Sequence, residues 1–141
     1  MSRKRQWLVG VMVLALIAIA YVHAQMDIAS SAIQFDLRMI GESLYEARAK
    51  NGVWPARIED LSATAYLALP HRKAMLENGV FVVVWHENLA PNPEANGQRV
   101  LAYDNKSLLP RFGRVWVCRG DLRVEYVEAE ELQRLLKINR E

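Results

Sequence analysis

The sequence predicts an α+β protein. We expect an N-terminal transmembrane helix that continues into a long amphipathic helix, packed on a small antiparallel sheet of about four strands, and then a short C-terminal helix. Three observations predict this: an apolar run near the N-terminus, a helical stripe of apolar residues after it, and later short β-branched segments separated by turn residues. The 141 residues suit one modest domain. We expect residues 1–25 to form a membrane anchor or signal peptide and residues 26–141 to form an extracytoplasmic domain.

The apolar run extends from Trp7 to Val22 and contains no charged residue. As a helix it is about 24 Å long at 1.5 Å per residue, against a hydrocarbon core of about 30 Å. Its aromatic residues Trp7 and Tyr21 fall near its two ends, where a membrane–water interface favours them. We therefore expect the larger apolar side chains of the run to form a membrane anchor. These are Trp7, Leu8, Val9, Val11, Val13, Leu14, Leu16, Ile17, Ile19, Tyr21 and Val22.

A basic cluster, Arg3, Lys4 and Arg5, comes directly before the run. Positive charges beside a membrane segment remain in the cytoplasm, which predicts a single-pass protein of the cytoplasmic (inner) membrane with its N-terminus inside and its domain outside. The alternative is a signal peptide cleaved after Ala24, because Val22-His23-Ala24 has small or modest residues where a signal peptidase reads them. Both interpretations place residues 26–141 outside the cytoplasm.

The next segment is amphipathic. Ile33, Leu37, Ile40 and Leu44 recur at alternating steps of four and three, which is one face of a helix. Together with Ile28, these side chains are expected to pack against the sheet or, in an assembly, against neighbouring helices. No proline occurs from residue 1 to residue 53, so the anchor and this segment can form one long helix, and Asn51-Gly52 is typical of a helix end.

The rest of the chain predicts short helical elements followed by strands. We expect helical turns at 58–61 and 64–69, the second closed by Pro70, a loop at 87–98, and a closing helix at 128–137 that buries its leucines. Four segments rich in β-branched and aromatic residues are expected to be strands. They are Gly79–His86, Arg99–Tyr103, Arg114–Cys118 and Leu122–Val127.

The last two predicted strands form a hairpin whose turn is Arg119-Gly120-Asp121. This tripeptide is also the motif that cell-adhesion receptors read on matrix proteins. Glycine and aspartate are common in tight turns for backbone reasons, and Gly120 is expected to supply a positive φ. The turn interpretation is therefore favoured over receptor adhesion.

Charge and cysteine content exclude several classes of protein. Three of the 18 basic residues are Arg3, Lys4 and Arg5, which leaves 15 basic against 16 acidic residues in the rest of the chain. That balance gives no basic field to hold nucleic acid. The single cysteine, Cys118, can form no internal disulfide, and we interpret it as a packed thiol or a thiol at a sheet edge.

No pattern of catalytic or metal-binding residues is visible. His23, His71 and His86 lack the spacing of a metal site. The acidic residues between 121 and 131 match no defined calcium loop and are interpreted as a solvated helix N-terminus. Trp54, Trp85 and Trp116 are interpreted as core or half-buried packing residues. The sequence thus predicts a protein that is not an enzyme, with no cofactor and no metal.

These pieces together resemble the type IV pilins and the type II secretion pseudopilins. The resemblance rests on the basic and apolar N-terminal helix, on a loose motif after the amphipathic helix, and on the C-terminal hairpin "VWVCRGDLRVEYVEAEEL". The motif residues are Tyr45, Asn51, Gly52, Trp54, Pro55, Asp60 and Leu61. The chain departs from the family at the processing site, because Gly10 is followed by Val11 rather than phenylalanine and no acidic residue precedes Asp27.

The resemblance implies a membrane-anchored, non-catalytic protein. It would act through protein–protein contacts in a cell-envelope secretion or pilus-like assembly, by its long helix and an exposed sheet edge. Its partners would be the membrane and other envelope proteins, or further copies of itself. The alternative is a secreted or periplasmic binding module, released after Ala24, that binds a small ligand or a glycan through Trp85 and Trp116.

Overall fold

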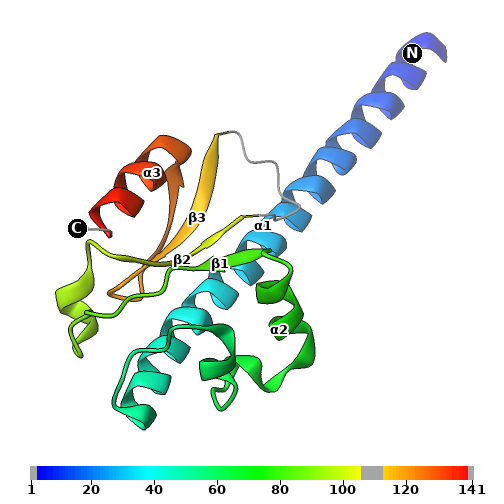
Figure 1. Ribbon diagram of the computed structural model, residues 1–141. Coiled ribbons are helices and arrows are strands. Elements are labelled where there is room, and N and C mark those ends of the chain that lie inside the picture. Colours follow the sequence, from blue (N-terminus) through cyan, green and yellow to red (C-terminus); the bar gives the residue numbers. More distant parts are fainter. Residues whose placement is uncertain (1–2, 106–112, 140–141) are drawn as a thin grey trace. The chain divides into compact units, whose positions relative to one another are not determined.

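The computed structural model describes residues 3–105 and 113–139 (Figure 1). It confirms the predicted α+β class, with a long apolar N-terminal helix, a four-stranded antiparallel sheet and a short C-terminal helix. The chain divides into two compact units, Met1–Ala32 and Ile33–Glu141. The predicted boundary at residue 25 separates a membrane anchor from an extracytoplasmic domain. The division into compact units does not test it, so it stays a prediction.

Helix α1 spans Arg3–Asn51 without interruption, as the absence of proline predicts. Arg48 and Lys50 lie in its last turn, where cations interact favourably with the helix dipole. The helix ends where expected. Gly52 has a φ of 76°, and its N–H donates to the Arg48 carbonyl at 2.9 Å. Glycine is the residue that adopts this left-handed conformation most easily.

Three short helical elements follow α1. They are η1 (Ile58–Leu61), η2 (Tyr66–Ala68) and α2 (Pro70–Glu77). The predicted helical turn at 64–69 ends before Pro70, since η2 stops at Ala68 and Leu69 is extended. The sequence did not predict that this proline also begins a further helix, α2. A helix leaves its first N–H groups unpaired, so the missing N–H of proline removes no hydrogen bond at that position.

The sheet consists of β1 (Phe81–Val83), β2 (Val100–Asp104), β3 (Arg114–Arg119) and β4 (Val124–Glu128), in that order and all antiparallel. The predicted first strand, Gly79–His86, was too long. Gly79 adopts a φ of 65° in a turn, and beyond Val84, whose N–H still donates to the Leu101 carbonyl at 2.8 Å, the chain leaves the sheet. The other strand bounds shift by one or two residues, and the loop after β1 contains a 3₁₀ turn, η3 (Pro93–Asn96).

The larger core lies between the sheet and the part of α1 from Ile33 onward. Gly41 marks the close approach of the two, since a Cβ at this position would lie 2.9 Å from the Cys118 Sγ. Ile28, predicted to pack either against the sheet or against neighbouring helices in an assembly, is not part of this core, since it is 65% exposed and belongs to the first unit. The second alternative stays a prediction. The buried residues of this cluster confirm the predicted stripe. They include Ile33, Leu37, Ile40, Leu44, Ala47, Leu61, Tyr66, Phe81, Leu101, Ala102 and Cys118.

Helix α3 (Ala129–Ile138) covers the other face of the sheet (Figure 1). Leu132 and Leu135 of α3 pack there with Val100, Val115 and Val117. Side chains alternate between the two faces along β3, because successive residues of a strand point in opposite directions. The sheet is therefore a middle layer between α1 and α3.

Candidate functional site

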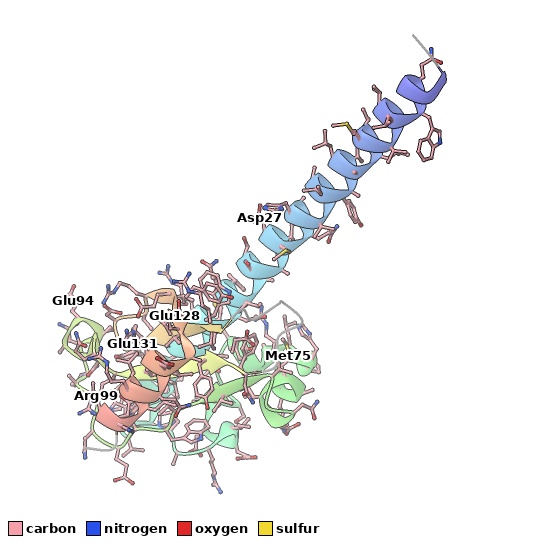
Figure 2. The ribbon with its side chains drawn as sticks, turned by 90° about the horizontal axis from the view of Figure 1, so that it is seen from above. Asp27, Met75, Glu94, Arg99, Glu128 and Glu131 are labelled. Atoms are coloured by element: carbon pink, nitrogen blue, oxygen red, sulfur yellow. The ribbon has the colours of Figure 1, made fainter. Side chains whose placement is uncertain are left out.

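The first candidate is the apolar segment of α1. Every predicted anchor residue is exposed, from 45% for Val11 to 73% for Trp7. The side chains point outward on all sides of the helix, and none of the apolar window is buried (Figure 2). The mean hydropathy here reaches 2.2, so the helix is long and apolar enough to cross a membrane, as an N-terminal signal sequence also is. Exposed apolar surface is unfavourable in water, at about 25 cal/mol per Å².

Of the predicted topology residues, Arg3, Lys4 and Arg5, the structure describes only the backbone, which is helical. Their role in fixing the direction of insertion stays a prediction. The first acidic residue after the apolar run is Asp27, which is exposed (Figure 2).

The second candidate is the hairpin between β3 and β4. The Arg119 N–H donates to the Arg123 carbonyl at 2.8 Å, and the Leu122 N–H donates to the Arg119 carbonyl at 2.9 Å. This is a three-residue loop in which a turn is followed by one residue in the left-handed region. That residue is Leu122, with a φ of 66°, and not Gly120. The predicted location of the turn is confirmed, but the prediction of a positive φ at Gly120 is wrong.

Gly120 is instead required by a close approach of two backbone segments. A Cβ on Gly120 would lie 2.2 Å from the carbonyl oxygen of Asn96 and 2.4 Å from its Cβ. The Tyr45 hydroxyl donates to the Gly120 carbonyl at 2.7 Å, and the Asn96 Nδ2 donates to that hydroxyl at 2.7 Å. Helix α1, the loop containing η3 and the hairpin are thereby joined. Sequence reasoning missed this cluster, because nothing in the sequence connects residues 45, 96 and 120.

The adhesion motif in this hairpin is not free to meet a receptor. Arg119 is only 8% exposed and forms an ion pair with Glu125. The Asp121 carboxylate accepts hydrogen bonds from the backbone N–H and the guanidinium of Arg123. These contacts favour the turn interpretation.

Cys118 and His86, two of the groups weighed as candidate chemical sites in the sequence, both lie in largely covered environments. Burial raises the pKa of the Cys118 thiol to about 12, so the nucleophilic thiolate is suppressed near neutral pH. The His86 Nε2 lies 2.7 Å from the Val100 carbonyl oxygen, and burial lowers the pKa of this imidazole. Within residues 3–105 and 113–139, no three His, Cys, Asp or Glu side chains gather in a way that could hold a metal ion.

Most of the acidic residues near α3 have arginine partners. Glu128, which lies with Glu131 at the start of α3 in Figure 2, pairs with Arg114 at 2.7 Å. Glu131 pairs with Arg134 at 2.6 Å. Glu128 and Glu130 are exposed at the start of α3, in keeping with the predicted solvated helix N-terminus. The ion pairs of this acidic group, which include those of Asp121 and Glu125, were not predicted from the sequence.

A cavity of about 360 Å³ lies beside the loop after β1. Trp116 does not line it and instead stacks on Tyr126, with 4.8 Å between the ring centroids. The structure therefore does not bring Trp85 and Trp116 into one binding platform. The cavity is lined by Trp85, His86, Glu87, Asn88, Leu89, Arg99 and Asn139.

A wider groove of about 730 Å³ runs along the start of β4. Its α1 side is formed by Gln34, Phe35 and Arg38, and its sheet side by residues 121–125. Phe35 is 55% exposed there. All of these residues belong to the second unit, so the groove is a property of the folded domain.

Comparison of the chain with protein-family models, with curated proteins and with solved structures finds no match in any of the three.

Proposed function

We propose that this chain is a membrane-anchored, non-catalytic protein with a pilin-like or pseudopilin-like extracytoplasmic domain. It crosses the cytoplasmic (inner) membrane once, with its N-terminus inside. It acts through protein–protein contacts in a secretion or pilus-like assembly of the cell envelope. The observation that carries the proposal is the change of environment along α1, from apolar side chains exposed on every side to a single buried stripe.

The anchor part of the proposal rests on side-chain exposure. Leu14 and Ile17 are 68% and 60% exposed, and their neighbours along the run are similarly open. Lipid is a solvent that removes this surface from water, and a helix satisfies its backbone hydrogen bonds internally while crossing it. The basic residues at the start of the chain support the direction of insertion.

The assembly part of the proposal rests on the surroundings of Cys118 and His86 and on the exposed apolar residues of α1. Cys118 is buried, and His86 is half-buried with its Nε2 2.7 Å from the Val100 carbonyl oxygen, which suits packing. In contrast, α1 carries exposed apolar residues beyond the run, such as Ile28 and Phe35. Single exposed apolar residues are common on proteins, so the assignment of these two to a protein contact is part of the proposal and is tested below.

A second candidate function is a released binding module. The cavity beside Trp85 favours it, because one aromatic ring lies there with the polar side chains of Glu87 and Arg99. Cavities of about 300 Å³ or more can hold small ligands. This function requires cleavage after Ala24 and would take a small polar ligand.

Photo-crosslinking in the native membrane tests the assembly proposal. A photoreactive amino acid replaces Ile28 in the full chain, and the matched control carries it at Ser62, which is exposed in the domain. We expect discrete protein crosslinks from position 28 and none from position 62. An intact full-length chain in the membrane that crosslinks only to lipid from position 28 would contradict the assembly role.

A further inference from the structure

Strand β4 is an edge of the sheet, because the strand order is β1-β2-β3-β4. Its pairing with β3 fixes which backbone groups are free. The Arg119 N–H donates to Arg123 at one end of the ladder, and the Ala129 N–H donates to Gly113 at the other. In an antiparallel pair, hydrogen-bonded positions alternate with positions whose N–H and C=O point away. By this alternation Val124, Tyr126 and Glu128 direct their backbone groups outward from the sheet.

The groove described above lies beside the first part of this edge. Leu122, Val124 and Glu125 line it from the hairpin and β4, and Phe35 and Arg38 line it from α1. A row of outward-pointing backbone donors and acceptors next to a helix with an exposed aromatic ring is the arrangement that accepts an added strand. Backbone hydrogen bonds then supply affinity, and the helix side supplies contacts for alternate side chains.

The charges in the groove indicate which strand would fit. Arg38 and Arg123 have side chains that are 64% and 67% exposed. The acidic residues of the same groove are more covered, Asp121 at 17% and Glu125 at 35%, and each is already bonded to an arginine. Arg38 is itself paired with Glu42 and Arg123 with Asp121, each through its Nε. The two guanidinium groups are nevertheless the more exposed charges of the groove, and each carries several N–H donors, so they can also take a carboxylate on the incoming segment.

We propose that β4 accepts an extended acidic segment of a partner protein as a fifth strand of the sheet. Apolar side chains of that segment contact Phe35 and Val124, and an aspartate or glutamate pairs with Arg38 or Arg123. This inference rests on the proposed function only in taking a protein as the partner, and it names the chemistry of the contact.

A segment from another protein fits better than β4 of a second copy. In β4 the two glutamates, Glu125 and Glu128, are already engaged by Arg119 and Arg114. A second copy would therefore bring carboxylates that already have arginine partners. An extended segment of another protein brings a carboxylate that has no such partner.

Peptide binding to the purified full-length chain in detergent tests the proposal. The probe is a fluorescein-labelled eight-residue peptide that alternates valine with aspartate and threonine, followed by fluorescence anisotropy. One control peptide has lysine in place of aspartate. A second is N-methylated at the residues whose N–H groups would face β4. We expect each control to bind at least tenfold more weakly.

Two variants locate the binding. Val124→Pro removes an outward N–H that takes no part in the β3–β4 ladder, and proline is tolerated at such edge positions. Arg38→Glu reverses the charge of the groove, and its matched control is Arg57→Glu, another exposed arginine paired with a nearby acid. We expect Val124→Pro and Arg38→Glu each to lower the affinity for the acidic peptide at least tenfold. Arg38→Glu should also raise the affinity for the lysine peptide, and Arg57→Glu should leave both affinities unchanged. Circular dichroism confirms that each variant is folded.

Equal binding of the aspartate and lysine peptides, or unchanged binding by folded Val124→Pro, would overturn the proposal. So would a concentration-dependent dimer that Val124→Pro dissociates, because the occupant of the edge would then be a second copy. None of these three results bears on the crosslinks from position 28, so this inference and the proposed function can fail separately.

Discussion

The two segments of α1, from Trp7 to Val22 and from Ile33 to Ala47, have the same backbone structure and opposite surroundings. In the first, apolar residues occupy every side of the helix and all of the large ones are exposed. In the second, the stripe of Ile33, Leu37, Ile40, Leu44 and Ala47 is buried, with Leu37 and Ile40 at 0% exposure, while Phe35 lies off the stripe and is 55% exposed. The difference teaches that the angular distribution of apolar residues, rather than helix formation itself, indicates what surrounds a helix.

The comparison can be put in energetic terms with one pair of residues. Burying a leucine side chain stabilises by about 1.5–3 kcal/mol. Leu37 obtains that stabilisation from the sheet, since it is fully buried. Leu14, at 68% exposure, does not obtain it from the protein, and a membrane would supply it.

The largest expected effect breaks the comparison directly. Leu37→Asp places a carboxylate in the core with no partner, which costs more than about 4 kcal/mol and should leave the domain unfolded. The matched substitution Leu14→Asp should leave the domain folded and weaken membrane insertion by about 2.5–3.5 kcal/mol. Urea unfolding and membrane fractionation measure the two quantities. Equal loss of folding in both variants would contradict the distinction between the segments.

Gly120→Ala should have the next largest effect, a loss of domain stability. The added Cβ meets the backbone of Asn96, which is not a flexible side-chain end, so the hairpin must shift. We expect a loss of about 3 kcal/mol in the free energy of unfolding, at the upper end of overpacking penalties. Gly10→Ala in the first segment is the control, since a Cβ there has nothing within 4 Å. Urea titration of both variants checks this, and a stable Gly120→Ala would show that the close approach is not needed.

Tyr45→Phe sharpens the comparison at a single hydroxyl. It removes the donor to the Gly120 carbonyl, while Asn96 keeps its bonds to the carbonyls of Ala90 and Asn92. One buried carbonyl left unpaired costs about 1–2 kcal/mol. Tyr21→Phe, whose ring is 65% exposed in the first segment, should change the free energy of unfolding by less than about 0.5 kcal/mol. Equal values for the two variants would remove Tyr45 from the stabilising cluster.

The smallest expected effect is the pH dependence due to His86. Burial lowers its pKa below the ordinary 6.5, so the unfolded chain binds the proton more readily than the folded one. The contribution of His86 to stability is therefore complete above about pH 6.5 and decreases as the pH falls below that value. Unfolding of the wild type and of His86→Gln between pH 5 and 7.5 tests this. The wild type should lose more stability on acidification, and parallel curves would contradict the assignment.

Local patterns carried most of the prediction. The step of four and three from Ile33 to Leu44 predicted the buried stripe, and Asn51-Gly52 predicted the end of α1, because both depend on neighbours along one helix. The hairpin was located by its turn residues for the same reason. The charge of the acidic residues was visible in the sequence, but their arginine partners were not, since Arg114 and Glu128 meet only across the β3–β4 ladder.

The errors came from contacts between distant residues. The positive φ lies at Leu122, whose side chain packs against the α1 core, and Gly120 is fixed by Asn96 across a loop. Turn statistics favour glycine where φ is positive, and for that reason the sequence analysis assigned the positive φ to Gly120. They contain nothing about the close approach of Asn96 to Gly120. Likewise the groove beside β4 needs α1 and the hairpin to meet, and no local pattern indicates that.

The intact mass of the protein, recovered from its own cells after membrane and soluble fractions are separated, tests the central claim most directly. We predict the mass of the uncleaved chain in the membrane fraction. A mass beginning at Gln25 in the soluble fraction would contradict the anchored protein and would favour the released binding module.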